Sequence, residues 1–312
     1  MPDYGRNPFM PEVLRGMLPM PSDDMGQPRD AVTKMLKPDR IAATWQCPDC
    51  GAQVQPRSIG RRWLPRAFCS CPGGTNRMQQ SRIRWAEQDR EDTEKIKRYR
   101  MLEACDLVGT GMTFDSWQAD TPARKRAEAF GRRMVQKLAQ GQWAFWWGPY
   151  GCGKTHMAHA VASALIMEHG RGARVINWLR QLREIQQSWS DNTKETPLWN
   201  AMLKTPVLFL DDFDKQLPRP SDLDKPHIKL PSSWYMESLY WIIDERYAHN
   251  RPTVLIANQS YQDTETVLQA IGGTAVDAVL SRFNRNGAIK LDWATTGVTE
   301  YTKSGNHDRP LF

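Results

Sequence analysis

A glycine-rich segment in the middle of the chain, residues 148–155, constrains the fold more than any other part of the sequence. It reads Gly-Pro-Tyr-Gly-Cys-Gly-Lys-Thr and fits the G-x-x-x-x-G-K-[S/T] template of a phosphate-binding loop. A compact apolar run at 143–147 predicts a buried strand before it, and spaced apolar residues at 158–166 predict a helix after it. Because the motif requires this strand–loop–helix context, a chance glycine-rich turn is the weaker interpretation.

The loop predicts a site for ATP and Mg²⁺. Its backbone amides and the positive end of the following helix are expected to surround the phosphates. Lys154 would neutralise charge on the β- and γ-phosphates, and the Thr155 hydroxyl would bind Mg²⁺. Cys152 stands at a variable position and is interpreted as filler, not as a nucleophile. The predicted ATP-binding residues are Gly148, Pro149, Tyr150, Gly151, Cys152, Gly153, Lys154 and Thr155.

Further strand-like apolar runs occur at 175–178, 207–210 and 253–257, each followed by a turn or a helix. Alternating strands and helices predict an α/β fold, with a parallel sheet covered by helices on both faces. Ligands of such folds bind at the carboxyl ends of the strands.

Polar residues follow two of these runs. Asp211 is placed to hold Mg²⁺, largely through water, and Asp212 to polarise the attacking water as a general base. Asn258 can orient that water or contact the γ-phosphate, although a lone asparagine after a strand is more often a turn residue. Arg282 lies near a predicted helix end and can serve a neighbouring subunit's γ-phosphate, with a surface salt bridge as the alternative.

In this order the motifs resemble the AAA+ ATPases, and among them the helicase loaders of the DnaC and DnaI type with the related IstB transposition ATPases. The likeness covers roughly residues 95–295 and includes the segments 98–104 (RYRMLEA), 112–117 (MTFDSW), 242–247 (IIDERY) and 280–283 (LSRF). The resemblance implies that Asp211 and Asp212 are the Walker B acids, Asn258 the first sensor and Arg282 the arginine finger. It also implies a core without a full helical lid, because only 30 residues follow Arg282 (312 − 282).

Four of the six cysteines, Cys47, Cys50, Cys69 and Cys71, lie close together in the sequence. Cys47-Pro48-Asp49-Cys50-Gly51 looks like a zinc knuckle, and Cys69-Ser70-Cys71 supplies two more thiolates. Four thiolates suit a structural, tetrahedral Zn²⁺, and in a reducing compartment such a cluster indicates a metal site more than a disulfide framework. Free thiols are the alternative, but a short segment with few apolar residues has little else to fold around.

Between the two cysteine pairs lies a basic and aromatic set that can contact nucleic acid or a partner protein. Its members are Arg57, Arg61, Arg62, Trp63 and Arg66. Some helicase loaders resemble this layout, with a small zinc-bearing N-terminal domain that engages the helicase, which favours contact with protein.

The expected domains follow the changes in composition. A proline-rich, largely disordered tail spans 1–44, the four-cysteine zinc module 45–76, a charged linker helix 77–109, the AAA+ domain 110–295 and a C-terminal tail 296–312. No apolar run approaches the ~20 residues of a membrane-spanning helix, and no secretory signal is evident, so a cytoplasmic protein is expected. A net charge of +7 favours an anionic partner such as nucleic acid.

Together these features predict a replication accessory ATPase that binds single-stranded DNA, assembles with itself in an ATP-dependent way and delivers a hexameric replicative helicase. An IstB-like transposition helper is the alternative within the class, and a zinc-containing nucleotide- and DNA-binding module without useful turnover is the alternative outside it. A small-molecule kinase is disfavoured because no lid or substrate-pocket motif is present. Arg180 and Arg183 are candidate DNA contacts, although a solvated helix face is the more common role for such residues.

Two departures from the plain pattern have no assigned role. An insertion at 217–231, rich in proline and charge, is interpreted as a surface loop. The chain also contains 13 tryptophans, among them Trp146, Trp147, Trp178, Trp189 and Trp199. Core packing is expected for most of them, and one or two could stack on single-stranded bases.

Overall fold

The computed structural model describes residues 45–54, 58–59, 62–63, 69–190, 192–285 and 288–298. The chain divides into two compact units, Met1–Glu94 and Lys95–Phe312. The expected disordered tail at 1–44 and the residues after 298 lie outside the described residues, as do the side chains of the basic set at 57–66.

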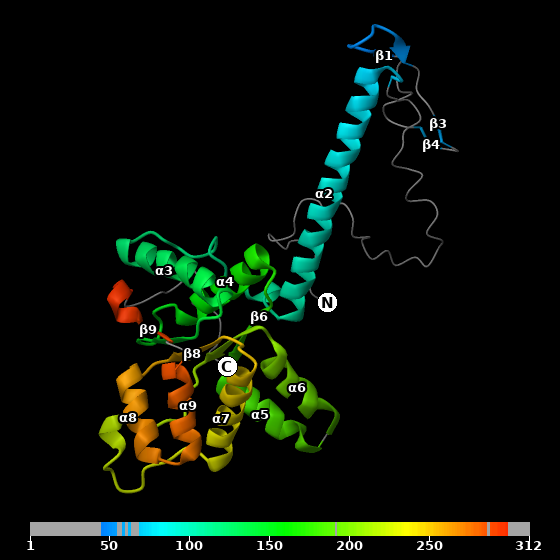
Figure 1. Ribbon diagram of the computed structural model, residues 1–312. Coiled ribbons are helices and arrows are strands. Elements are labelled where there is room, and N and C mark those ends of the chain that lie inside the picture. Colours follow the sequence, from blue (N-terminus) through cyan, green and yellow to red (C-terminus); the bar gives the residue numbers. More distant parts are fainter. Residues whose placement is uncertain are drawn as a thin grey trace, which may run out of the picture. The chain divides into compact units, whose positions relative to one another are not determined.

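The first unit contains two small antiparallel hairpins and most of a long helix (Figure 1). Strand β1 (Trp45–Gln46) pairs with β2 (Gln53–Val54), and β3 (Ser58–Ile59) pairs with β4 (Arg62–Trp63). Helix α2 (Pro72–Ala104) starts with proline, whose missing N–H and fixed φ suit a first helical position. The linker helix expected over 77–109 therefore begins earlier, next to the cysteines, and ends earlier, and its last ten residues (95–104) belong to the second unit.

The second unit is built on one five-stranded parallel sheet in the order β6-β7-β8-β5-β9. Its strands are β5 (Ala144–Trp147), β6 (Ala173–Asn177), β7 (Val207–Asp211), β8 (Thr253–Ala257) and β9 (Ile289–Asp292). Its helices are η2 (Val108–Thr110), α3 (Pro122–Ala139), α4 (Lys154–His169), α5 (Trp178–Gln187), η3 (Ser188–Ser190), α6 (Asn192–Lys204), η4 (Pro220–Asp222), α7 (Ser233–Ala248), α8 (Tyr261–Ile271), α9 (Thr274–Arg285) and η5 (Trp293–Thr296). The predicted strands are present, and β9, which the sequence analysis missed, adds a parallel edge strand beside β5.

Helices cover both faces of this sheet, as the sequence predicted. Helices α3 and α4 lie on one face and α5 to α9 on the other (Figure 1). Strand β5 shows why: Ala144 and Trp146 belong to the core under α3 and α4, whereas Phe145 belongs to the core on the opposite face. Successive side chains of a strand point to opposite faces, so a strand covered on both sides is apolar throughout.

One sequence expectation at a strand end was wrong. The run expected to be a strand over 175–178 ends at Asn177, and Trp178 is already the first residue of α5. The reason is local, because the Asn177 side chain accepts a hydrogen bond from the backbone N–H of Arg180 at 3.1 Å and caps the helix. Trp146 and Trp178 are fully buried, as expected for core residues, whereas Trp189 is 52% exposed.

A fully buried arginine, Arg246 on α7, joins the ends of several elements at the amino-terminal edge of the sheet. Its guanidinium donates to the carbonyls of Met202, Thr205 and Pro252, each at 2.7 Å, and its Nε donates to the Thr253 hydroxyl at 2.8 Å. These acceptors come from the end of α6, the start of β7 and the start of β8, so one side chain satisfies polar groups that the fold would otherwise bury unpaired.

Among the described residues, no helix is long and apolar enough to cross a membrane.

Candidate nucleotide site and four-cysteine cluster

The glycine-rich loop joins the end of β5 to the start of α4. Gly151 (φ 77°) and Gly153 (φ 89°) adopt left-handed backbone conformations that residues with a side chain rarely occupy. Gly148 is required for a different reason: a Cβ there would lie 2.7 Å from Cβ of Trp293. Its three glycines thus let the loop turn tightly and pack against η5.

Lys154 lies folded back over its own loop. Its ammonium donates to the carbonyls of Gly148 at 2.8 Å and Pro149 at 2.9 Å, and to Oδ1 of Asn258 at 3.1 Å. An ammonium has three N–H donors, so these acceptors use all of them. A bound phosphate must therefore replace at least one of these partners.

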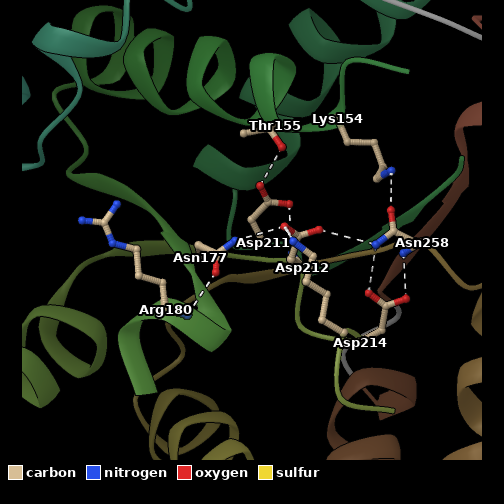
Figure 2. Close-up of polar contacts among 9 residues, drawn as sticks. Lys154, Thr155, Asn177, Arg180, Asp211, Asp212, Asp214 and Asn258 are labelled. Atoms are coloured by element: carbon tan, nitrogen blue, oxygen red, sulfur yellow. Dashed lines mark hydrogen bonds and ion pairs between the residues drawn. The ribbon is translucent and has the colours of Figure 1, made fainter. Parts of the chain in front are cut away.

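The predicted magnesium ligands meet. The Thr155 hydroxyl donates to Oδ2 of Asp211 at 2.7 Å, across from the start of α4 to the end of β7 (Figure 2). Burial raises the pKa of Asp211 to about 6, although the Thr155 hydrogen bond opposes the rise. A hydroxyl and a carboxylate side by side fit Mg²⁺, which is usually held by one or two protein oxygens with water and phosphate completing its shell. The pair Thr155 and Asp211 is thus the place where this chain can hold the ion.

Asp212 is held from three sides in an uncommon backbone conformation. Its φ is 55°, a left-handed value that aspartate tolerates better than most residues. Its Oδ2 accepts from Nδ2 of Asn177 at 3.0 Å and pairs with the Lys215 ammonium at 2.7 Å, while Oδ1 accepts from Nδ2 of Asn258 at 3.4 Å. Strained non-glycine positions cluster at functional sites, which agrees with a functional role for this carboxylate.

Three residues in this network were not among the predicted site residues: Asn177, Asp214 and Lys215. Asn177 ends β6 as Asn258 follows β8, so its position at a strand end was the missed signal. Asp214 and Lys215 lie in the same short run as the predicted acids, Asp-Asp-Phe-Asp-Lys at 211–215. Sequence alone does not tell which charges of such a run point inward.

Arg282, the predicted arginine finger, forms an ion pair with Asp244 of α7 in this single chain. Its guanidinium carbon also lies 5.7 Å from the ring centre of Tyr247. Arg180 and Arg183 are exposed on α5, where Arg180 pairs with Glu184 at 3.0 Å.

The insertion at 217–231 does more than loop over the surface. Its first residues, including Leu217 and Arg219, line a cavity of about 730 Å³ together with Tyr150 of the glycine-rich loop and Asn258. Leu217 is buried, which anchors this end of the insertion on the core. The rest of this end, including the exposed Arg219, lies on the surface as expected and forms a wall beside the candidate nucleotide site.

In the first unit the four predicted cysteines converge. Their sulfur atoms all lie within 4.8 Å of one another, with Cys47 3.7 Å from Cys71 and Cys50 3.5 Å from Cys69. Zinc–sulfur bonds of about 2.3 Å in a tetrahedron place the sulfurs about 3.8 Å apart, so the spacing fits Zn²⁺. The knuckle turn also fits its sequence, because Gly51 has a left-handed φ of 74°.

The start of helix α2 forms part of this cluster. The backbone N–H of Gly74 donates to Sγ of Cys71 at 3.2 Å, and Arg77 donates to Sγ of Cys47 at 3.2 Å while pairing with Asp49. A Cβ at Gly74 would lie 2.2 Å from the carbonyl oxygen of Cys69, so only glycine fits at this third position of the helix. Hydrogen-bond donors and a positive charge directed at sulfur stabilise thiolates, the form that binds metal.

Comparisons with known proteins give one family match within the second unit and several similar solved structures. Residues 144–270 match the family described as "ATPase family associated with various cellular activities (AAA)". No curated protein matches the chain. Among solved structures the chain is similar to the DnaC helicase loader (22% identity, covering 55% of this chain and 94% of that chain, TM-score 0.43) and to DnaI (20% identity, 58% and 87%, TM-score 0.42). It is also similar to domain III of the replication initiation protein DnaA from Thermotoga maritima (15% identity, 59% and 66%, TM-score 0.42). With a phosphate-binding loop, paired acids and a polar strand end gathered at one edge of its sheet, the second unit of this chain contains an AAA-family ATPase domain.

Proposed function

We propose that this chain is a cytoplasmic, ATP-hydrolysing helicase loader or a closely related replication accessory ATPase. The observation that carries the proposal is the pairing, in one chain, of an AAA-family match over residues 144–270 with a separate unit that gathers four cysteines. The flanking segments that resemble the loader family, at 98–104 and 112–117, support the same assignment.

The nucleotide site is proposed to work as a switch. Lys154 would bind the β- and γ-phosphates after leaving Asn258, and Thr155 and Asp211 would hold Mg²⁺, which would screen the phosphate charge. Asp212 accepts the proton of the attacking water, and Asn258 orients that water. Before Asp212 can act as a base, its carboxylate must break the ion pair with Lys215 and accept a hydrogen bond from the attacking water.

Arg282 is proposed to complete the site of a neighbouring copy of this chain. Its partner in the single chain is Asp244, so assembly would exchange that ion pair for the neighbour's γ-phosphate. An arginine in this role stabilises the charge that develops during phosphoryl transfer. Turnover would then rise with protein concentration, because the active site forms between two copies.

The remaining parts are proposed to bind macromolecules. The four-cysteine cluster, loaded with Zn²⁺, would fix a small module that binds the hexameric helicase. Single-stranded DNA would be held by the AAA domain, with Arg183 as a candidate phosphate contact and the exposed Trp189 as a candidate stacking surface.

A pull-down with a purified hexameric replicative helicase tests the proposal. We expect the helicase to be retained in the presence of ATP and to be lost on Cys47→Ser, whereas Cys105→Ser, which removes a thiol outside the cluster, should retain it. Asp212→Asn should bind ATP without hydrolysing it, and the helicase should then stay bound to the variant.

Each other outcome points to a different protein. Retention of a transposase in place of a helicase would identify a transposition helper. ATP binding without hydrolysis in the wild type, and no difference between wild type and Asp212→Asn, would leave only a nucleotide-binding module and would refute the proposal.

A further inference from the structure

Asp214 is a buried carboxylate in the turn after β7 that none of the proposed roles uses. Only 3% of it is exposed. Its Oδ2 accepts from the backbone N–H groups of Asn258 and Gln259, both at 2.8 Å, and its Oδ1 accepts from Nδ2 of Asn258 at 3.4 Å. All these donors belong to the turn that follows β8. One carboxylate thus ties the acidic turn to the polar end of the neighbouring strand (Figure 2).

Burial raises the pKa of Asp214, and the hydrogen bonds from the two backbone amides oppose that rise. A buried carboxylate without donors would be costly, so an apolar residue would be the simpler choice at this position if only packing mattered. Apart from its own backbone N–H, the donors that offset this cost come from Asn258 and Gln259. What the carboxylate adds to the molecule is therefore a fixed position for that turn.

The contacts of Asn258 also fix which way its amide points. Oδ1 accepts from the Lys154 ammonium at 3.1 Å, and Nδ2 lies 3.4 Å from carboxylate oxygens of both Asp212 and Asp214. An amide nitrogen only donates and an ammonium only donates, so the reverse orientation would set like groups against each other on both sides. Asn258 consequently stands between Lys154 of the phosphate loop and Asp212, the proposed general base.

We propose that Asp214 is a positioning residue for ATP hydrolysis, holding the backbone and the amide of Asn258 at the place where the γ-phosphate and the attacking water meet. A displacement of about 1 Å at a catalytic group can lower the rate about 100-fold. The inference concerns turnover in the AAA domain, so it holds or fails independently of the helicase-loading proposal.

The alternative is that Asp214 only caps the backbone N–H groups of the turn and does not position the Asn258 side chain. Asp214→Asn distinguishes this structural role from the positioning role. The asparagine keeps one oxygen, which can still accept from the backbone N–H groups of Asn258 and Gln259. Its amide nitrogen must then face Nδ2 of Asn258, and two donors cannot bond to each other. The substitution therefore preserves the cap and removes the hold on the side chain.

Steady-state ATPase assays on the full chain measure the result. We expect Asp214→Asn to lower kcat by about 10- to 100-fold, because the amide is no longer held in place, while the KM for ATP changes less than about threefold. Glu168→Gln, which neutralises an exposed carboxylate at the opposite end of α4 from Lys154, should keep the wild-type kcat. Asp214→Glu, which keeps the charge but shifts it by a methylene, should show the same loss in kcat.

A double-mutant cycle then tests whether Asp214 acts through Asn258. Once Asn258→Ala has removed the amide, adding Asp214→Asn should lower kcat by less than about twofold more. Independent losses that multiply in the double variant would overturn the proposal, as would a wild-type kcat in Asp214→Asn. If neither Asp214 variant folds, hydrogen exchange on the wild type decides, because rapid exchange of the Asn258 and Gln259 amides would show that the carboxylate does not hold this turn.

Discussion

Replacing Asp211 by asparagine should make the nucleotide-free protein more stable while it abolishes Mg²⁺-dependent turnover. The pKa of this buried carboxyl rises from 3.8 to about 6, with burial as the main cause. A raised carboxyl pKa stabilises the folded state only while the group is protonated. That contribution is complete below pH 3.8 and is lost as the pH rises through 6. At pH 7 Asp211 is ionised in both states, and burial of its charge lowers the stability of the folded protein.

The magnitude follows from the change in pKa. Roughly two pKa units at about 1.4 kcal/mol each give about 3 kcal/mol. Asparagine can keep an acceptor for the backbone N–H of Asp212, which now donates to Oδ1 of Asp211 at 3.0 Å. Its amide can donate to the Thr155 hydroxyl, which rotates to accept, so at most about 1 kcal/mol of hydrogen bonding is lost. The net gain at pH 7 is about 2 kcal/mol, or about 4–8 °C in Tm.

Thermal unfolding of both proteins between pH 4 and pH 7, without nucleotide or Mg²⁺, provides the measurement. The stability difference should be near zero or reversed at pH 4 and should grow toward pH 7. Equal pH dependence in Asp211→Asn and the wild type, or lower stability of the variant at pH 7, would refute the reasoning. With ATP and Mg²⁺ added, only the wild type should gain stability.

Three further predictions concern stability and metal binding. Arg246→Ala should lower the free energy of unfolding by about 3–5 kcal/mol in urea titrations, since several buried acceptors lose their donor, and a loss under about 1 kcal/mol would contradict the contacts. Burial lowers the pKa of His159 to about 4, so between pH 6.5 and pH 4 the unfolded chain gains a proton at this residue that the folded chain does not. His159→Leu should therefore reduce the loss of stability over this pH range, and the same pH dependence of stability in variant and wild type would contradict this. The purified chain should bind about one Zn²⁺ by elemental analysis. Cys69→Ser should lose that ion and Cys105→Ser should keep it, whereas retention of zinc by Cys69→Ser would place the ion elsewhere.

The local parts of the nucleotide site could be predicted because their geometry depends on neighbours in sequence. Gly151 and Gly153 must take left-handed conformations in the loop, and the strand and helix on either side show the required periodicity. The same holds for the strand that ends in Asp211. Its run of apolar residues is buried on both faces, so the polar residues after it could only lie at the sheet edge.

Some boundaries and elements could not be predicted, for physical reasons that can be named. β9 is short and only partly buried, so its four residues give no clear apolar run. The end of β6 depends on a side-chain cap by Asn177, which competes with continuation of the strand. Convergence of the four cysteines was expected from their spacing, but the part played by the start of α2 depends on contacts of Gly74 and Arg77 that the sequence does not reveal.

The sequence by itself determined the strand, the glycine-rich loop and the helix of the candidate triphosphate site, since that motif works through its own backbone. The tertiary structure decided which other residues lie beside the loop. Because β8 lies between β5 and β7 in the sheet, Asn258 stands between Lys154 and Asp212, and Asp214 can reach across to hold it. The order of parallel strands depends on how the connecting helices pack, which no short stretch of sequence specifies.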